Sequence, residues 1–479
     1  MLELNPFRKN KVSLQDYDYQ KDIQNRLLMA QFKEDDLKVL EEILFGHPKL
    51  TVSSLAQDLL MEESDVAAIL TKLSHSGLFS IKDHQILLNK EMRKYFEAQL
   101  QQFEEDFIPG MEYLQSLLRK VPFDVLLTWY PIPRTSNNIF DSLVEKYLLT
   151  PQIFQRYLME LQFNHPKISS IVEDVYRASQ FYIEASQLKK KHDLSDEEFH
   201  EIVLHLEFNF VCCLVYKKRG DEWIQVVAPF YEWQEYLKFL KESKPKALEN
   251  EKSVLRWRDS DFAFIEDMTQ LLKLVKESPL QLNLNKNEEW IPDKSSLKSL
   301  LKLIPSFNPS FQEDFALSYL GKLVQKLVFL GLCKIQDSTL KIHDSSDEWL
   351  RLSIENRALA VYKHTLTKLE SLPFSTEVGT ERSIREIEKS IHCVLHLGWV
   401  EFSDFLKSVT AIVSKDSKIC LKKLGKSWKY TLPKYTEEEV HLIKTTIMDW
   451  LFEAGFVSLG YSEDKRYFRV TPFGQTIFS

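Results

Sequence analysis

Glycine is scarce in this sequence, with 12 residues in 479, and this scarcity limits the kinds of site that the chain can build. Phosphate-binding loops depend on closely spaced glycines, because only glycine lets the backbone approach the phosphate closely and adopt left-handed conformations. The sequence contains no GxxxxGK[ST], no GxGxxG after a predicted strand and no GxSxG. It therefore predicts a protein that is not an enzyme, and it identifies no cofactor and no small-molecule substrate.

Cysteine is also limited. The five cysteines form no CxxC pair, and their odd number argues against a disulfide framework and favours a reducing compartment. They are Cys212, Cys213, Cys333, Cys393 and Cys420. The stretch HEIVLH has its histidines, His200 and His205, five residues apart, whereas a zinc-binding HExxH helix needs them four apart on one face. We therefore predict no metal site.

Long apolar runs are missing as well. No stretch of about 18 apolar residues occurs, as a membrane-spanning helix would require, and the first residues carry charges where a signal peptide needs an apolar segment. These absences predict a soluble, cytoplasmic protein with no membrane association. There is no excess of basic residues either, since 62 Lys and Arg stand against 70 Asp and Glu and the net charge is -8. Any binding of anions must therefore be local.

What the sequence has instead is a repeated pattern of short amphipathic helices. Apolar residues recur at helical spacing over 52–60 and again over 66–73, after a third helix expected over 35–45. The residues MEES between the last two helices are enough for a tight turn, with Ser64 as the N-cap of the second helix. Two apolar runs then surround the polar tip at residues 82–85, which is the pattern of a small hairpin, or wing. This spacing predicts a helix-turn-helix followed by a wing.

A glycine four residues after an apolar residue marks the end of the second helix. This pairing occurs at Leu73/Gly77, Leu327/Gly331, Val394/Gly398 and Leu451/Gly455. Such a glycine ends a helix in the left-handed conformation without a steric cost from Cβ. The pattern therefore predicts that the module recurs along the chain.

Two copies carry further signals. The last copy has a capping box, Thr436 with Glu439, and a closing hairpin whose tip is predicted at residues 463–466. A copy over residues 185–231 lacks the glycine but has a capping box, Ser195 with Glu198, and strands around KKRGDE. There Asn209 is expected in the left-handed position, because asparagine tolerates it better than most residues.

These patterns predict a mainly α fold with small β-hairpins (α+β), in which winged-helix domains follow one another and are joined by helical spacers. Each domain is expected to have its own core. The predicted boundaries are an N-terminal arm (1–30), winged helix 1 (31–106), a helical spacer (107–165), winged helix 2 (166–242), a helical linker (243–296), winged helix 3 (297–370) and a C-terminal winged-helix region with a lysine-rich insert (376–479).

Two resemblances support this organisation. The segment LAQDLLMEESDVAAILTKLSHSGL resembles the helix-turn-helix of winged-helix proteins, and YFRVTPFGQTIFS resembles the closing hairpin and last helical turn of winged helices that accompany helicases and transcription machinery. The opening MLELNPFRKNKVSLQDYDYQKDIQNRLLMAQF and the segment IPRTSNNIF are similar to an uncharacterised chlamydial protein family, which implies no activity. The resemblance to the module extends over about two thirds of the chain and implies fold more strongly than function.

The N-terminal modules are poorly suited to DNA. In a DNA-binding winged helix, the second helix of the pair enters the major groove and basic residues neutralise phosphates. In the first module this helix opens with Glu62, Glu63 and Asp65 and offers only Lys72 and His75. In the copy at 195–211, the acids expected to face or flank a polyanion are Asp196, Glu197, Glu198, Glu201 and Glu207. Acids in the first turn of a helix also interact favourably with the helix dipole. Whether or not that is why they are present, they disfavour DNA binding. These modules are therefore predicted to bind protein or to pack on their neighbours.

The segment 407–434 has the opposite charge, with eight lysines against the single acid Asp416. Trp428 and Tyr430 interleave with the lysines, and such a segment could follow a phosphate backbone and stack bases. The alternative is an edge strand that lysines protect from aggregation, with both aromatic residues turned into the core.

The candidate nucleic-acid contacts in this region are Lys415, Lys418, Lys422, Lys423, Lys426, Trp428, Lys429 and Tyr430, together with the wing-tip residues Lys465 and Arg466. A second candidate is the tip formed by Lys217, Lys218 and Arg219, for which solvated charge is the ordinary explanation.

The sequence thus favours a non-enzymatic protein that binds DNA through its C-terminal winged helices and a protein partner of a larger complex through its N-terminal ones, in transcription or chromosome maintenance. One alternative is an assembly scaffold of winged helices with no nucleic-acid contact. Another is a hydrolase or transferase with an unfamiliar site.

Overall fold

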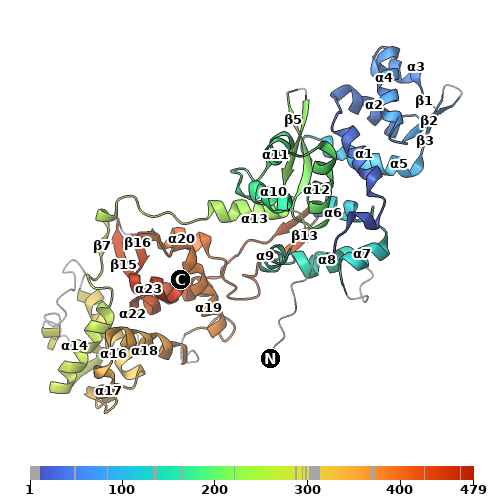
Figure 1. The fold of residues 1–479 in the computed structure, drawn as a ribbon. Coiled ribbons are helices and arrows are strands. Elements are labelled where there is room, and N and C mark those ends of the chain that lie inside the picture. Colours follow the sequence, from blue (N-terminus) through green and yellow to red (C-terminus); the bar gives the residue numbers. More distant parts are fainter. Residues whose placement is uncertain are drawn as a thin grey trace. The chain divides into compact units, whose positions relative to one another are not determined.

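The computed structural model describes residues 11–47, 50–82, 85–132, 138–161, 163, 166–220, 222–285, 289–293, 295–296, 299–300, 313–367, 373–425, 427–463 and 465–479. The described chain forms two compact units (Figure 1). Unit 1 contains residues 1–239 and 420–431, and unit 2 contains residues 240–419 and 432–479. Both units are built mainly from helices, with small antiparallel sheets of two to four strands. This confirms the predicted fold class.

One arrangement of strands occurs four times. In each copy a short strand pairs with the second strand of a later hairpin, so that the sheet orders are β1-β3-β2, β4-β6-β5, β8-β11-β10 and β12-β16-β15. A helix precedes the short strand, and another helix leads directly into the hairpin. We call each copy a helix-hairpin module. Modules 1 and 2 lie in unit 1, and modules 3 and 4 lie in unit 2.

The modules have the following elements. Module 1 contains α2 (Glu34–Phe45), β1 (Leu50–Thr51), α3 (Val52–Leu59), α4 (Glu63–Ser74), β2 (Phe79–Lys82) and β3 (Gln85–Leu88). Module 2 contains α10 (Pro166–Arg177), β4 (Ile183–Glu184), α11 (Ala185–His192), α12 (Asp196–Phe208), β5 (Cys213–Arg219) and β6 (Glu222–Ala228). Module 3 contains α14 (Ala263–Glu277), β8 (Leu280–Leu284), α16 (Glu313–Phe329), β10 (Cys333–Gln336) and β11 (Thr339–Ile342). Module 4 contains α19 (Glu381–Lys389), β12 (Val400–Glu401), α20 (Phe402–Ser408), α21 (Glu437–Thr445), α22 (Leu451–Glu453), β15 (Val457–Ser462) and β16 (Lys465–Val470).

Other elements surround the modules. Those of unit 1 are α1 (Tyr19–Met29), α5 (Lys90–Leu100), α6 (Met111–Leu118), α7 (Phe123–Trp129), α8 (Ile139–Leu143), the π-helical turn η3 (Val144–Leu148), α9 (Pro151–Glu160), the first nine residues of α13 (Tyr231–Glu242) and the hairpin of β13 (Leu421–Leu424) and β14 (Ser427–Tyr430). Those of unit 2 are β7 (Leu255–Arg256), β9 (Trp290–Pro292), α17 (Ser346–Arg351), α18 (Ile354–Thr367), the turns η6 (Ser390–Val394) and η7 (Thr446–Trp450), and α23 (Pro472–Phe478).

Glycine ends three of the helices as predicted. Gly77, Gly331 and Gly455 have φ angles of 70°, 70° and 71°, which is the left-handed region where a Cβ would be strained. The prediction for Gly398 is wrong, because its φ is not positive. A side chain at Gly398 would meet the carboxylate of Glu251, the end of an exposed and flexible side chain.

Two further local predictions are wrong. Asn209 has φ -93° and ψ 10°, and the left-handed residue that ends α12 is the next one, Phe210, with φ 60°. Ser64 does not cap α4, because that helix begins at Glu63 and its N-cap is Glu62. The capping boxes of Ser195 with Glu198 and of Thr436 with Glu439 are both confirmed.

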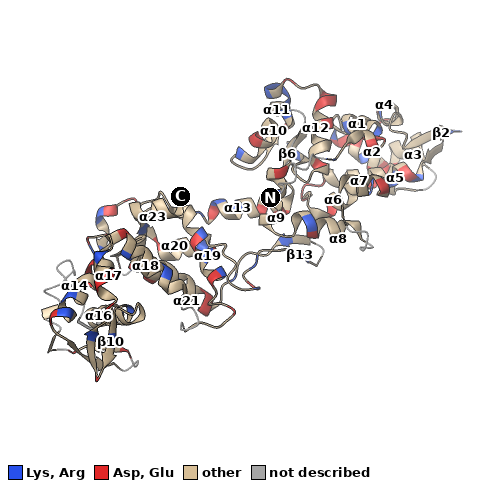
Figure 2. Cartoon of the chain, turned by 60° about the horizontal axis from the view of Figure 1, so that its bottom comes forward, with Lys and Arg blue, Asp and Glu red and all other residues tan. Residues whose placement is uncertain are grey.

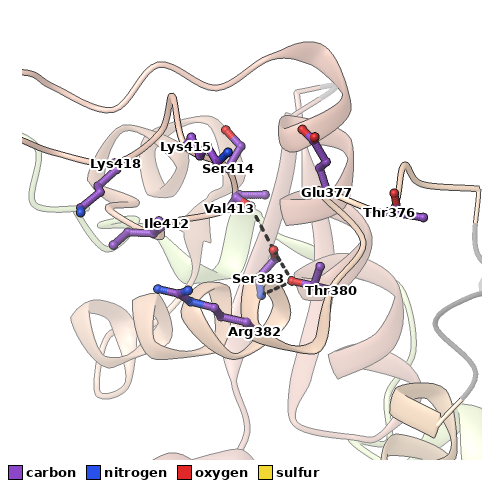
Figure 3. Close-up of a pocket in the computed structure, with 10 residues that line it drawn as sticks. All are labelled: Thr376, Glu377, Thr380, Arg382, Ser383, Ile412, Val413, Ser414, Lys415 and Lys418. Atoms are coloured by element: carbon purple, nitrogen blue, oxygen red, sulfur yellow. Dashed lines mark hydrogen bonds between the residues drawn. The ribbon is translucent and has the colours of Figure 1, made fainter.

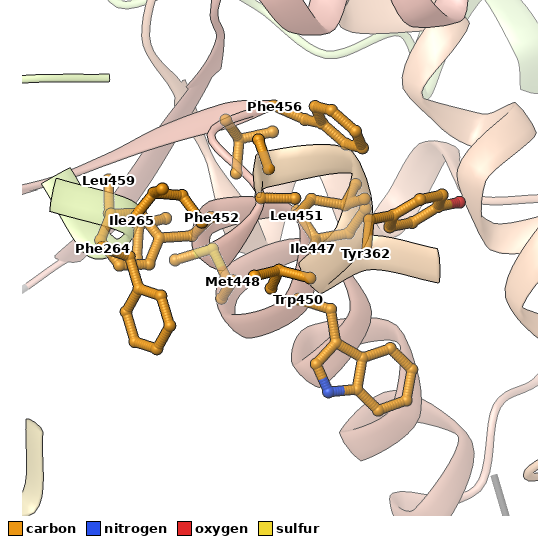
Figure 4. Close-up of a cluster of buried hydrophobic side chains, with 14 of the residues drawn as sticks. Phe264, Ile265, Tyr362, Ile447, Met448, Trp450, Leu451, Phe452, Phe456 and Leu459 are labelled. Atoms are coloured by element: carbon orange, nitrogen blue, oxygen red, sulfur yellow. The ribbon is translucent and has the colours of Figure 1, made fainter. Parts of the chain in front are cut away.

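The modules do not have separate cores, so that expectation is wrong. One cluster of buried side chains includes Val39 and Leu70 of module 1 as well as Val203 and Leu214 of module 2. A second cluster joins modules 3 and 4. There Phe264 and Ile265 from α14 lie near Leu451 and Phe452 from α22 (Figure 4). Each core therefore spans two modules. Two modules packed together bury more apolar surface than each module would bury by itself, because a small domain buries a smaller fraction of its surface.

The chain between modules contributes to them. Residues 243–296, predicted as a helical linker, provide α14 and β8 of module 3, and β7 extends the sheet of module 4 by pairing with β15. Residues 1–30, predicted as an arm, include α1, which packs on α12 of module 2. The segment between α20 and α21 of module 4 contains the β13–β14 hairpin, which belongs to unit 1.

Candidate nucleic-acid interface

The hairpin of β13 and β14 carries part of the predicted lysine segment and lies against the segment from α8 to α9 in unit 1 (Figure 1). The Leu421 amide donates to the Leu149 carbonyl at 2.7 Å, and the Tyr430 hydroxyl donates to the Leu148 carbonyl at 2.8 Å. Leu148 and Leu149 lie at the end of η3, where the last carbonyls of a helix have no partner within the helix. The hairpin therefore completes the hydrogen bonding of this helix end.

The two faces of the hairpin differ. Because side chains alternate along a strand and Leu421 pairs with Tyr430 and Lys423 with Trp428, these four residues share one face. Leu421 and Tyr430 are buried there, and the Tyr430 ring contacts the rings of Trp233 and Tyr236. The predicted role of Tyr430 in stacking bases is therefore wrong, because its ring lies in the core. Trp428 is half-buried, with its ring edge on Phe140 at 6.0 Å between centroids.

Three lysines of the hairpin are exposed. Lys422 lies directly opposite Lys429 across the two strands on one face of the hairpin, and Lys423 is exposed on the other face. Figure 2 shows basic residues on β13. Like charges at directly opposed positions destabilise a strand pair. Among the described residues, none of the three lysines forms an ion pair. Lys426 lies outside the described residues. The exposed lysines of this hairpin therefore form a local site of uncompensated positive charge.

The hairpin belongs to unit 1, whereas Lys415 and Lys418 belong to unit 2. Both line an open pocket of about 490 Å³, together with Arg382 from α19 (Figure 3). The predicted segment thus divides into a hairpin in one unit and a pocket in the other. Arg382 was not among the sequence candidates, because it is far from the lysines along the chain.

The predicted tip of the last hairpin is also divided. Lys465 forms an ion pair with Glu401 at 3.0 Å. Arg466 is exposed. Burial lowers the pKa of Lys444, and the positive charges of Arg466 and Lys322 lower it further, whereas the Asp449 carboxylate raises it. Lys444 lies on α21, the helix that leads toward the hairpin, so this helix and the hairpin tip carry neighbouring cations. Sequence reasoning missed Lys444 and also Lys322, whose charge is paired with Asp449 at 2.6 Å.

The basic tip of module 2 is largely neutralised. Lys218 pairs with Glu105 at 3.4 Å, Arg219 pairs with Glu184, and the Lys217 ammonium lies 3.6 Å from the centre of the Tyr182 ring. Such contacts leave little charge for a phosphate. These residues are therefore better described as a solvated or locally paired surface than as a nucleic-acid contact.

The acidic helices remain unsuited to DNA, with one correction. The predicted outward position of Glu207 is wrong, because its side chain is fully buried and pairs with Arg26 at 2.5 Å. In α4, Lys72 bonds to Asp36 at 2.6 Å and to the Gln31 carbonyl at 2.7 Å. Lys72, the basic residue of α4, is therefore already used within the fold.

Leu60 is the most exposed large apolar residue described. It lies in the turn between α3 and α4 with φ 55° and is 94% exposed. A non-glycine residue gains no packing there to offset the left-handed strain. We expect Leu60→Gly to raise the free energy of unfolding by roughly 0.5 kcal/mol, the strain relief exceeding the added chain entropy of glycine. Chemical denaturation of Leu60→Gly and of Leu60→Ala checks this. Equal or greater stability in the alanine variant would contradict it, because alanine keeps the strain.

Glu232 is expected to make the stability of unit 1 depend on pH. Its side chain is buried on α13, its Oε1 accepts from the Met111 amide at 2.9 Å, and burial raises its pKa to about 7. The folded chain therefore keeps a proton that the unfolded chain loses above about pH 4.5. Stability is expected to fall by roughly 3 kcal/mol as the pH rises from 4.5 to above 7.

Glu232→Gln tests this expectation because the amide oxygen still accepts from Met111. Unfolding measured from pH 4.5 to 8 should show that the variant is close to the parent at low pH and more stable at pH 8. Parallel pH profiles for the two proteins would rule out the assignment.

No group of three or more His, Cys, Asp or Glu that could hold a metal ion occurs in the part of the chain that the structure describes. Burial lowers the pKa of His200 to about 3 and raises the pKa of the Cys212 and Cys213 thiols, so these groups are neutral and buried. No helix within the described ranges is both long enough and apolar enough to span a bilayer.

No family model, no curated protein and no solved structure matches this chain.

Proposed function

We propose that this chain is a nucleic-acid-associated protein without catalytic activity, in which the helix-hairpin modules are winged helices. It contacts the phosphate backbone of DNA through the exposed lysines of the β13–β14 hairpin and, in unit 2, through Arg466 and Lys444. The acidic modules 1 and 2 bind a protein partner of a transcription or chromosome-maintenance complex. The repeated order of helix, strand, helix and hairpin supports the winged-helix assignment.

The observation that carries the proposal is the opposed pair Lys422 and Lys429 on one face of the hairpin, with Lys423 exposed on the adjoining position of β13. Placing two like charges across a strand pair costs stability. A polyanion that binds the exposed side removes this repulsion and releases its own counterions. The proposed contact is to phosphates, and it involves no reading of bases because Tyr430 is buried and Trp428 packs on Phe140.

The test is the salt dependence of DNA binding. Binding of the full chain to a duplex is measured from about 50 to 300 mM salt and compared with a variant in which Lys422, Lys423 and Lys429 are all changed to Gln. If three phosphate contacts are lost, the slope of log K against log salt becomes shallower by about 2.7. The matched control changes three exposed lysines elsewhere in unit 1 to Gln, Lys90, Lys94 and Lys190, and it should keep the parent slope. No binding at about 50 mM salt, or the same slope in all three proteins, contradicts the proposal.

A second candidate function, an assembly scaffold, is favoured by the exposed apolar residues of module 1. Phe45 is 59% exposed and Leu60 94%, and acidic residues such as Glu62 and Glu63 lie beside Leu60 in sequence. An apolar side chain gains more from burial in a protein contact than from a position beside a charged phosphate backbone. A chain that binds no duplex at low salt but still assembles with a protein partner fits this function instead.

A further inference from the structure

The pocket in unit 2 is a small basic site that is distinct from the hairpin. It lies between the start of α19 and the loop of residues 411–419. Arg382, Lys415 and Lys418 supply its cations, Glu377 supplies its single acid, and Thr376 and Ser414 add hydroxyl groups (Figure 3). Among the described residues, Arg382 and Lys415 form no ion pair. The volume of about 490 Å³ lies within the range of pockets for small ligands.

Hydrogen bonds hold the walls of the pocket in place. The buried Ser417 hydroxyl accepts from the amides of Val413 and Ser414 at 2.9 and 2.8 Å, which shapes the loop. The Ser383 hydroxyl donates to the Val413 carbonyl at 3.0 Å and ties the loop to α19. The loop backbone is therefore preformed, which lowers the entropy that a ligand would lose on binding.

The charge of the pocket selects among phosphate groups. Three cations and one carboxylate leave two net positive charges. A phosphomonoester carries about -1.5 to -2 at pH 7, whereas an internal phosphodiester of nucleic acid carries one negative charge. The pocket therefore matches a monoester better than a backbone phosphate.

The rest of the lining indicates what carries the phosphate. Among the described residues that line the pocket there is no aromatic side chain, so they offer no surface on which a base could stack. The Glu377 carboxylate and the hydroxyl groups can instead exchange hydrogen bonds with the hydroxyls of a sugar.

We propose that this pocket binds the phosphomonoester of a sugar phosphate. The same chemistry has two sources, a free sugar phosphate and the 5′-phosphorylated end of a nucleic acid. Recognition of a nucleic-acid end rests on the proposed function, whereas binding of a free sugar phosphate does not.

Calorimetric titration of the full chain with ribose 5-phosphate tests the pocket. We expect binding that weakens at least tenfold in the Arg382→Gln, Lys415→Gln variant. Binding should also weaken as the pH falls from 7 to 5, because the monoester takes up a proton near pH 6. The matched control changes Lys407 and Lys434 to Gln, two exposed lysines of the same segment in unit 2 that do not line the pocket, and it should bind as the parent does. Absence of binding at millimolar ribose 5-phosphate, or equal binding by the pocket variant and the parent, overturns the proposal.

Binding of two oligonucleotides, one with a 5′-phosphate and one with a 5′-hydroxyl, distinguishes a nucleic-acid end from a free sugar phosphate. A preference for the phosphorylated end that the pocket variant loses supports recognition of nucleic-acid ends. Binding of ribose 5-phosphate without such a preference supports a free sugar phosphate. The Lys422, Lys423, Lys429 variant should weaken both oligonucleotides equally and leave ribose 5-phosphate binding unchanged, so failure of the hairpin proposal is distinguishable from failure of this one.

Discussion

Replacing Glu207 by alanine is expected to lower the free energy of unfolding by about 3 to 5 kcal/mol, because it leaves a buried charge without its partner. The Glu207 carboxylate accepts from the Arg26 guanidinium at 2.5 Å and from the Leu214 amide at 3.0 Å. The side chains of Arg26 and Glu207 are 3% and 0% exposed. After the substitution, Arg26 would keep only the more distant Asp22, at 3.8 Å. The pair joins α1 to α12 and β5, so its loss should also loosen α1.

Denaturant unfolding of three further variants checks this result. Glu201→Ala, on the same helix but only half-buried, should change stability by about 0.5 kcal/mol or less. The double variant Arg26→Met, Glu207→Leu should recover most of the loss, because well-packed apolar residues replace a buried ion pair with little cost. If Glu207→Ala is no less stable than Glu201→Ala, or if the double variant is as unstable as Glu207→Ala, the pair does not have the role inferred here.

Local sequence patterns predicted the elements whose causes are local. Amphipathic spacing located α3, α4 and α12, and capping boxes located the starts of α12 and α21. The left-handed glycines Gly77, Gly331 and Gly455 followed from steric reasoning about a single residue. Each of these features depends on contacts within a few positions of the chain.

The features that the sequence did not predict depend on pairs distant along the chain. Glu207 is an acid at a helical position, and only the approach of Arg26, 181 residues away, shows why it is buried. The hairpin of β13 and β14 reads as part of module 4, but its backbone and Tyr430 bond to Leu148 and Leu149 in unit 1. The lysine segment was therefore one patch in sequence and is two sites in the fold.

The position of the β13–β14 hairpin within module 4 has a local explanation. The segment that carries it lies between α20 and α21. At the corresponding position, between their last two helices, modules 1 and 2 have only a short turn. A long segment is tolerated in such an exposed turn because the entropy of closing a loop grows slowly with its length. The hydrogen bond from the Thr431 amide to the Cys420 carbonyl, at 2.9 Å, closes the base of the hairpin. Module 4 can thus keep its sheet order while its turn supplies a hairpin to unit 1.

At position 210, replacing Phe210 by glycine is expected to give a protein about 1 kcal/mol more stable than replacing it by alanine. This is the reverse of the order expected inside a helix. Phe210 has φ 60°, and the Val211 amide donates to the Leu206 carbonyl at 3.0 Å. The same bond, from the residue after the left-handed position to a carbonyl five residues earlier, follows Gly331 and Gly455. Phe210 thus occupies a position where the other modules have glycine.

The ring of Phe210 explains why a strained residue is present. It is 1% exposed and stacks on Tyr130 at 5.3 Å between centroids, with Tyr157 at 5.9 Å. Removing a buried aromatic ring costs about 3 to 5 kcal/mol, which exceeds the left-handed strain of about 1 to 2 kcal/mol. Both Phe210→Ala and Phe210→Gly should therefore be less stable than the parent, but only the glycine variant also relieves the strain.

The matched control is Phe199, a fully buried ring inside α12 with ordinary helical geometry. There Phe199→Gly should be about 1 kcal/mol less stable than Phe199→Ala, because glycine disfavours a helix interior. Denaturant unfolding of the four variants gives the two differences directly. The opposite signs at Phe210 and Phe199 are the diagnostic result, since loss of packing alone would make glycine the worse substitution, or an equal one, at both positions.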